Sequence, residues 1–208
     1  MKLSCVLLFI VCGNQLLTDA MHGGDIDYIE KVPYMAQVFR LYKGGLKSFC
    51  GAAILTGRWL VTAAHCTAPK ETVLSTQVRV GTNYTLTGGE LYNISRIINY
   101  KQYYNSANRW NDDISLIKLE GLVKFNNNRQ PISISRVPPK VGDEIVIDGY
   151  GDDYDGVYGT CLKVGYQKVI SIDECRKAFS RTDRKNIEID NRVFCTNSTT
   201  LDLCPGLH

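Results

Sequence analysis

Short apolar-rich segments separated by turn residues recur along most of the chain. The pattern predicts strands at 32–42, 52–55, 59–62, 77–80, 94–99, 114–119, 132–134 and 144–147. Gly, Pro or Asn stands near most of their ends, and this spacing is typical of an antiparallel barrel or sandwich. One helix is predicted at 172–179, where Ser171 and Glu174 can form a capping box. The pattern therefore predicts an all-β protein with one short helix.

The first twenty residues have the organisation of a secretory signal peptide. Lys2 gives the charged start, 6–12 the apolar run, and Thr18 and Ala20 the small residues before a cleavage point. The apolar run is too short to span a bilayer. We expect cleavage after Ala20, secretion of the chain, and an extracellular location.

Cysteines and sequons agree with an extracellular location. Of the eight cysteines, six lie after the predicted signal, and disulfides are the default state of cysteine in an oxidising compartment. Six cysteines allow fifteen pairings, so the sequence alone leaves the pairing open. Sequons predict N-glycosylation at Asn83, Asn93 and Asn197.

The charge balance is ordinary, with 24 Lys+Arg against 21 Asp+Glu and a formal net charge of +3. There is no polybasic run, so neither nucleic acid nor an anionic membrane is expected as a partner. His65-Cys66 has no second Cys/His pair at ligand spacing, so no metal site is predicted. No cofactor is expected.

The segment Trp59–Cys66 places an imidazole at the exit of a predicted buried strand. A catalytic base needs an orienting group on its far nitrogen and a proton donor on its near one. Taken alone, His65 is more often a structural histidine than a base, and a metal ligand is the weaker alternative.

Neighbouring motifs favour the catalytic interpretation of His65. Phe49-Cys50-Gly51-Ala52, followed by Trp59-Leu60-Val61-Thr62-Ala63-Ala64-His65-Cys66, resembles the histidine motif of the trypsin and chymotrypsin family of serine proteases. The segment 111–119 resembles the family's aspartate motif, in which Asp113 matches the buried carboxylate that orients the imidazole. The segments 149–151 and 33–38 resemble the Gly-Trp-Gly turn, here with Tyr150, and the first strand. The resemblance runs from about Met21 to the last residue.

This resemblance implies two antiparallel Greek-key barrels, at about 33–125 and about 140–208, with the second barrel incomplete. It places His65 and Asp113 in a cleft between them and implies a protein or peptide as substrate or partner. It also implies the disulfides Cys50–Cys66 and Cys175–Cys195.

Two further cysteines remain open. Cys161 and Cys204 match family cysteines whose partners would lie beyond His208. They are free thiols, pair with each other, or bond to another chain.

The chain departs from the family at the nucleophile. The family motif reads Cys-x-Gly-Asp-Ser-Gly-Gly-Pro, and this chain reads Cys204-Pro205-Gly206-Leu207-His208. Leu207 matches the aspartate of the activation switch, and His208 matches the nucleophilic serine. Imidazole at that position cannot replace the serine oxygen that His65 would activate.

Other family positions are kept in part. Gly206 matches one of the two oxyanion amides, and Asp202 matches the base of a specificity pocket for Arg or Lys. The start of the mature chain, Met21-His22-Gly23-Gly24, differs from the family's Ile-Val-Gly-Gly and has no Arg or Lys before it.

Three interpretations follow. The first is a secreted, non-catalytic serine protease homologue that acts by binding. The second is an active trypsin-like endopeptidase, cleaving after Arg or Lys, whose C-terminal part is missing from this sequence. The third is a non-functional remnant that misfolds.

Overall fold

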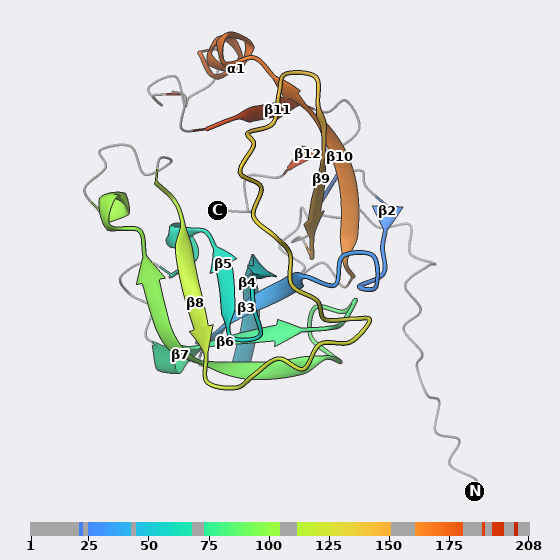
Figure 1. Cartoon of the computed structure of the whole chain (residues 1–208), viewed down its shortest axis with the longest axis vertical. Coiled ribbons are helices and arrows are strands. Elements are labelled where there is room, and N and C mark those ends of the chain that lie inside the picture. The colour runs from blue at the N-terminus through green and yellow to red at the C-terminus, as the bar shows by residue number, and fades with distance from the viewer. Residues whose placement is uncertain are drawn as a thin grey trace, which may run out of the picture.

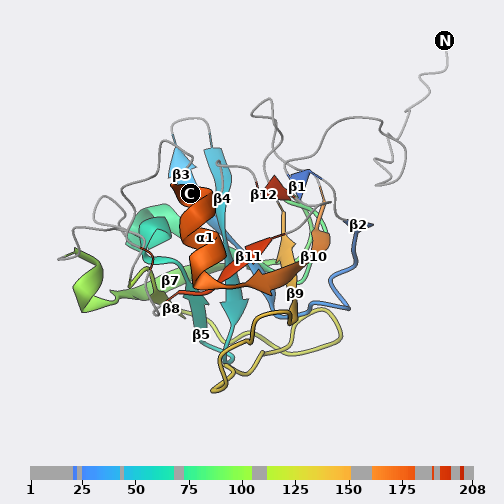
Figure 2. The ribbon, with the colours of Figure 1, turned by 90° about the horizontal axis from the view of Figure 1, so that it is seen from above.

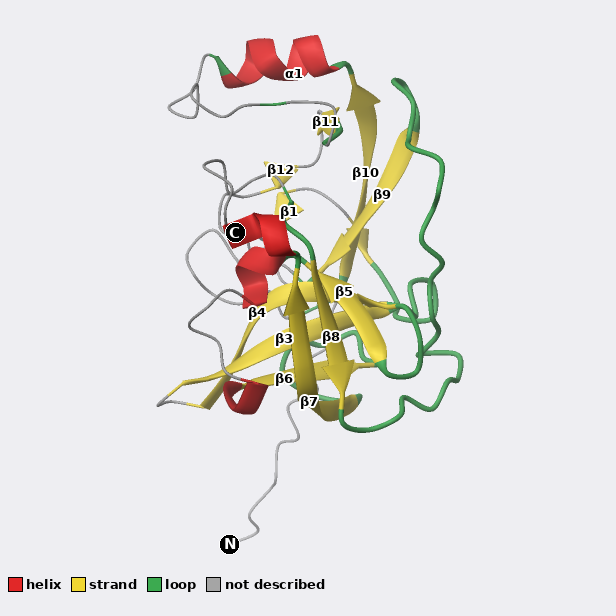
Figure 3. Ribbon diagram, turned by 60° about the vertical axis from the view of Figure 1, so that its left-hand side comes forward, coloured by secondary structure: helices red, strands yellow, loops and turns green. Residues whose placement is uncertain are grey.

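The computed structural model describes residues 21–22, 25–42, 45–67, 73–104, 112–150, 161–180, 189, 193–197 and 202–203. Within these ranges the chain forms two halves, one above the other in Figure 1. The lower half is a closed barrel, and the upper half is an open sheet with the one α-helix of the described residues (Figure 3). The predicted fold class is confirmed. The predicted signal peptide, 1–20, lies outside the described residues.

The closed barrel has six antiparallel strands in the order β3-β4-β5-β8-β7-β6, with β6 pairing back to β3. Because β8 lies between β5 and β7, the order is not sequential, as in a Greek key. The strands are β3 (Met35–Tyr42), β4 (Gly45–Ile54), β5 (Trp59–Thr62), β6 (Thr76–Val80), β7 (Glu90–Asn99) and β8 (Ser115–Leu119).

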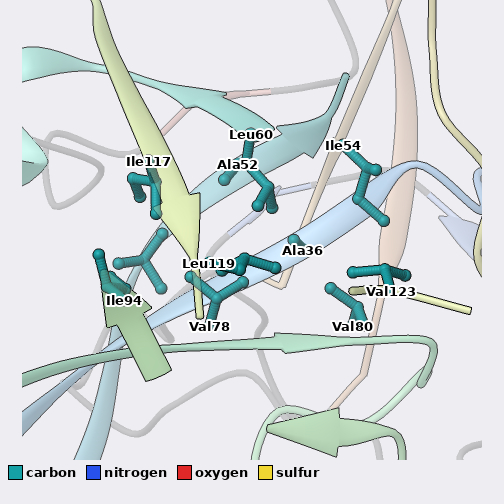
Figure 4. Packing of buried hydrophobic residues seen from close by; sticks show 11 residues of the cluster. Ala36, Ala52, Ile54, Leu60, Val78, Val80, Ile94, Ile117, Leu119 and Val123 are labelled. Carbon is teal, nitrogen blue, oxygen red and sulfur yellow. The ribbon is translucent and has the colours of Figure 1, made fainter. Parts of the chain in front are cut away.

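Alternation along these strands fills the barrel. On β6 and β8 every second residue is buried, as expected for strands with one face on a core. Side chains from all six strands meet inside the barrel (Figure 4). The core comprises Ala36, Val38, Ala52, Ile54, Leu60, Val78, Val80, Ile94, Ile117, Leu119 and Val123.

The open sheet is built around β10 (Lys163–Ile170). β10 pairs with β9 (Glu144–Gly149) over six residues, with β2 (Asp25–Ile26) at its start and with β11 (Cys195–Asn197) at its end. A separate two-stranded pair joins β1 (Met21–His22) to β12 (Asp202–Leu203).

The helix α1 (Ile172–Phe179) follows β10 and has the predicted bounds. Its capping box is formed: Ser171 Oγ accepts from the Glu174 amide at 3.2 Å, and the Ser171 amide donates to Glu174 Oε2 at 3.0 Å. Figure 2 looks down on α1 and β11. The described part of the barrel half also has the 3-10 helices η1 (Ala64–Thr67), η2 (Val73–Ser75) and η3 (Lys101–Tyr104).

One predicted strand is wrong, and one long strand was not predicted. The segment 132–134 forms no strand; the Ile132 amide makes a single bond to the Ile54 carbonyl at 2.8 Å, and the segment is exposed. β10 was missed because several of its buried positions are taken by Lys163, Gly165 and Gln167, so the apolar alternation of a half-buried strand is absent.

A small second core joins the two halves. Ile29, Val32 and Met35 from the start of the chain pack with Tyr150 and Leu162 from the open sheet and its loops. Hydrogen bonds cross the same junction: Tyr150 donates to the Thr82 carbonyl at 2.6 Å. The Leu162 amide donates to the Asn83 carbonyl at 2.7 Å. Among the described residues, no helix combines the length and apolar composition that crossing a bilayer requires.

Candidate active site

His65 lies on η1, immediately after the barrel strand β5. The preceding strand buries Leu60 and Thr62, and Ala64 is fully buried, so the backbone on the N-terminal side of His65 is fixed by packing. On its C-terminal side, the disulfide Cys50–Cys66 ties η1 to β4. By the chain-entropy estimate, a loop of this size contributes about 3 kcal/mol. The imidazole is therefore carried by a rigid segment.

Asp113 lies just before β8 and reaches His65 with both carboxylate oxygens. Its Oδ2 is 2.6 Å from Nδ1 of the imidazole, and its Oδ1 accepts the His65 amide at 2.7 Å. A carboxylate on Nδ1 holds the proton on that nitrogen and leaves the Nε2 lone pair free to accept a proton. This is the geometry of a base with its orienting group.

The electrostatics favour an ionised Asp113. Burial works to raise its pKa, but hydrogen bonds from the His65 imidazole and from the amides of His65 and Ala64 outweigh it, so the pKa lies below its usual value. The His65 side chain is 34% exposed and that of Asp113 is 21% exposed. The imidazole is thus accessible to a ligand while its orienting group is more covered.

A buried polar network behind this pair was missed from the sequence. Thr67 Oγ1 lies 2.8 Å from Ser115 Oγ and 2.5 Å from Asn99 Oδ1, and the Asn99 amide group donates to the Thr67 carbonyl at 3.1 Å. Thr67 and Ser115 each follow a member of the pair by two residues, so the network joins η1 to β8. Hydroxyl and amide side chains give no sequence signal for such a contact.

Of the predicted catalytic, oxyanion and substrate-binding residues, the described part of the structure brings together His65 and Asp113. Asp202 lies on β12, where its backbone pairs with His22, and its side chain is not described. Gly206 and His208 lie outside the described residues, as does Leu207.

Two disulfides of the described residues join the cysteines that the family resemblance implies, and Cys161 is also disulfide-bonded. Cys50–Cys66 and Cys175–Cys195 are both present, the second linking α1 to β11. Cys161 is 6% exposed and is also disulfide-bonded, with a partner outside the described residues, so it is not a free thiol in this structure. Cys204 lies outside the described residues. Cys50 and Cys66 lie near His65, but their sulfur atoms bond to each other and so are not thiolate ligands for a metal.

The three sequons differ in their surroundings. Asn93 on β7 and Asn197 on β11 are exposed. Asn83 is half-buried, and its Oδ1 accepts the Ile29 amide at 2.5 Å. The sequon partner of Asn83, Thr85, is only 3% exposed.

A two-half β-protein with an Asp-oriented histidine beside a disulfide defines the class of trypsin-like serine proteases and their homologues. The sequence model described as Trypsin matches residues 21–206. The chain belongs to the trypsin family.

Individual relatives are distant. The chain is 28% identical to Trypsin 5G1 of Aedes aegypti over 160 residues, which cover 76% of this chain and 58% of that protein. It is 29% identical to Trypsin delta of Drosophila erecta over 184 residues, which cover 88% of this chain and 70% of that protein. The chain thus spans less than two thirds of the mosquito trypsin.

The fold resembles the crystal structure of the scabies mite inactivated protease paralogue S-D1. The TM-score is 0.73 at 21% identity, over 85% of this chain and 74% of that chain. At this identity the likeness supports the fold alone.

Proposed function

We propose that this chain is a secreted, non-catalytic member of the trypsin family that acts by binding a protein or peptide. One observation carries the proposal. His65 keeps its orienting carboxylate, with Nδ1 2.6 Å from Asp113 Oδ2, while Leu207 and His208 match the activation aspartate and the nucleophilic serine. Acyl transfer by this family needs the serine oxygen within reach of the base. The described disulfides and the three sequons support an extracellular location.

The similar fold of the scabies mite inactivated protease paralogue is compatible with the proposal, since this fold occurs in a protein described as an inactivated protease. The accessible surface around His65 can still contact a peptide segment, although the covalent step is lost. Family membership makes proteins or peptides the expected ligands.

Active-site labelling tests the proposal. The purified secreted chain is treated with a fluorescent serine-directed phosphonate, with an active trypsin as positive control. We expect no label on the chain. Stoichiometric labelling that disappears on heat denaturation would show a working nucleophile. That result would contradict the proposal.

The second candidate is an active trypsin-like endopeptidase of which this sequence is only a part. It is favoured by the intact His65–Asp113 contact and by the 58–70% coverage of the relatives. Sequencing the transcript beyond the codon for Cys204 separates the two candidates. An open frame encoding Gly-Asp-Ser-Gly-Gly-Pro supports the endopeptidase, in which Asp202 would select Arg or Lys and Gly206 would supply an oxyanion amide. A transcript that encodes Leu207 and His208 followed by a stop codon supports the non-catalytic homologue.

A further inference from the structure

The polar network behind the active-site pair repeats the spacing of the pair itself. His65 and Asp113 connect η1 to the segment before β8, and Thr67 and Ser115 connect the same two segments two residues further along. In both contacts the partners are 48 residues apart in the sequence. Two parallel contacts fix the distance between two segments and also their relative rotation. The second contact therefore bears on the orientation of the imidazole.

The donors and acceptors of the network follow from the atoms present. The Thr67 carbonyl can only accept, so the Asn99 atom that lies 3.1 Å from it is the donor Nδ2, and Asn99 Oδ1 faces the Thr67 hydroxyl. Because Oδ1 brings no proton, the Thr67 hydroxyl donates to it. The single proton of that hydroxyl is then used. The Ser115 hydroxyl, 2.8 Å away, is therefore the donor to Thr67 Oγ1.

The alternative acceptors are farther away. The Ala64 carbonyl lies 3.3 Å from Thr67 Oγ1, and the Ile98 carbonyl lies 3.4 Å from Ser115 Oγ. Both exceed the usual distance of a hydroxyl hydrogen bond. The chain of donation thus runs from Ser115 through Thr67 to Asn99, and hydrogen bonds arranged in series polarise and strengthen one another.

Burial makes this network costly to disrupt. Thr67 is 3% exposed and Ser115 is 1% exposed, and buried polar groups need partners. Register places Asn99 of β7 opposite Ser115 of β8, so the network joins η1 to two neighbouring strands. The disulfide Cys50–Cys66 ties η1 to β4 instead. The Thr67 contact thus supplies what the disulfide does not, a tie to the strand that Asp113 precedes.

We propose that Thr67 is a positioning residue for His65. Its hydroxyl, held between Ser115 and Asn99, keeps η1 at the distance from β8 at which Asp113 holds the proton on Nδ1 of the imidazole. Thr67 acts only through that pair. The consequence for a ligand is a fixed hydrogen-bond acceptor, because Nε2 then carries the lone pair. The inference applies to either candidate function, so its test measures the imidazole and not binding or activity.

The tautomer of His65 tests the proposal. Nitrogen-15 chemical shifts of a neutral imidazole distinguish a proton on Nδ1 from a proton on Nε2. They are measured on the full secreted chain, and His65→Ala assigns the signals among the three histidines of the sequence. We expect the wild type to carry the proton on Nδ1. Thr67→Val, which keeps the branched shape but lacks the hydroxyl, should show a mixture of the two tautomers.

Rescue and a matched control separate positioning from general destabilisation. Thr67→Ser keeps the hydroxyl and should keep the wild-type tautomer. Thr82→Val removes another buried hydroxyl, which donates to the Thr87 carbonyl at 2.9 Å in the turn between β6 and β7, and should leave the tautomer unchanged. Ser115→Ala removes only the tie to β8 and should give a smaller share of the second tautomer. It provides the test if Thr67→Val does not fold.

Four outcomes would overturn the proposal. An unchanged tautomer in both Thr67→Val and Ser115→Ala would show that the network is structural only. An equal mixture in Thr82→Val would show that the loss of any buried hydroxyl loosens the site. A mixture in Thr67→Ser would assign the effect to the methyl group, and a mixture in the wild type would show that Asp113 does not hold the proton on Nδ1. None of these results depends on a nucleophile, which the labelling experiment tests separately.

Discussion

At the scale of single residues, the site depends on Asp113, because His65 engages both of its carboxylate oxygens. Asp113→Asn replaces one acceptor by an amino group, which must face either the His65 amide or the imidazole. We expect a loss of about 1–3 kcal/mol in the free energy of unfolding at neutral pH, the cost of an unsatisfied buried group. Urea denaturation of the variant and the wild type measures it.

The same comparison has a defined pH dependence. The folded-state pKa of Asp113 is lowered, so the stabilisation is present above its unfolded pKa and is lost as pH falls through the folded pKa. The difference in the free energy of unfolding between the wild type and Asp113→Asn should therefore become smaller in acid. A gap that stays constant down to acid unfolding would show that the carboxylate charge contributes nothing.

A second aspartate, Asp148, should behave in the opposite way. Burial raises its pKa and the nearby Asp27 adds to this, although the Tyr34 hydroxyl donates to Oδ2 at 2.5 Å. Its Oδ1 is buried without a hydrogen-bond partner among the described residues. A raised pKa means that the fold favours protonated Asp148, and this stabilisation is lost as pH rises through the folded pKa.

Asp148→Asn should thus gain stability relative to the wild type between about pH 4, near the usual pKa of aspartate, and neutrality. Urea denaturation at several pH values follows the difference. Asp25→Asn, at an exposed position of β2, is the control for the substitution itself. If the wild type instead gained stability relative to Asp148→Asn as the pH rises, the expectation would be contradicted.

Of the site residues, the sequence supplied His65 and Asp113 only through the family resemblance, since no spacing rule brings together residues 48 positions apart. The Thr67, Asn99 and Ser115 network could not be predicted, because each residue is polar and ordinary in its own segment. Such contacts depend on strand register, which the sequence does not state.

At the scale of elements, α1 depends on its capping box. Ser171→Ala removes the acceptor of the Glu174 amide and should cost about 1 kcal/mol. Ser171→Thr keeps a hydroxyl at the N-cap and should lose much less. Thermal unfolding by circular dichroism compares the two. Equal losses would mean that the Cys175–Cys195 disulfide, and not the cap, holds the start of the helix.

The elements also show where sequence patterns suffice. The bounds of α1 were predictable because the capping box is local, and β5 because Trp59, Leu60 and Val61 form an apolar run. β10 was not predictable, since Lys163 and Gln167 are buried by the sheet around them. Conversely, 132–134 has the composition of a strand but finds no neighbour with which to form a ladder.

At the scale of the whole molecule, Asn83 connects the two halves. Its backbone carbonyl accepts the Leu162 amide from the upper half, and its side chain accepts the Ile29 amide from the segment that leads into the barrel. Asn83→Ala should therefore cost about 1 kcal/mol, the net value of one hydrogen bond, measured by urea denaturation. Asn93→Ala, whose side chain accepts from half-buried Gln77 in an exposed hydrogen bond, should cost less. Equal costs would show that the side-chain bond from Asn83 to Ile29 contributes no more than a surface bond, while the carbonyl contact with Leu162 is kept in this variant.

The same contacts predict which sequons carry glycans in the folded, secreted protein. A glycan on Nδ2 of Asn83 would have to leave a half-buried site whose Oδ1 is fixed by Ile29 and whose Thr85 is buried. Asn93 and Asn197 lie at exposed strand positions, which leave more room for a glycan. We expect peptide mapping after glycosidase treatment to find both of these sites occupied and Asn83 unmodified. Full occupancy of Asn83 in protein with an unchanged melting temperature would show that the junction opens enough to admit a sugar chain, and that the two halves are held together chiefly by the apolar cluster around Leu162.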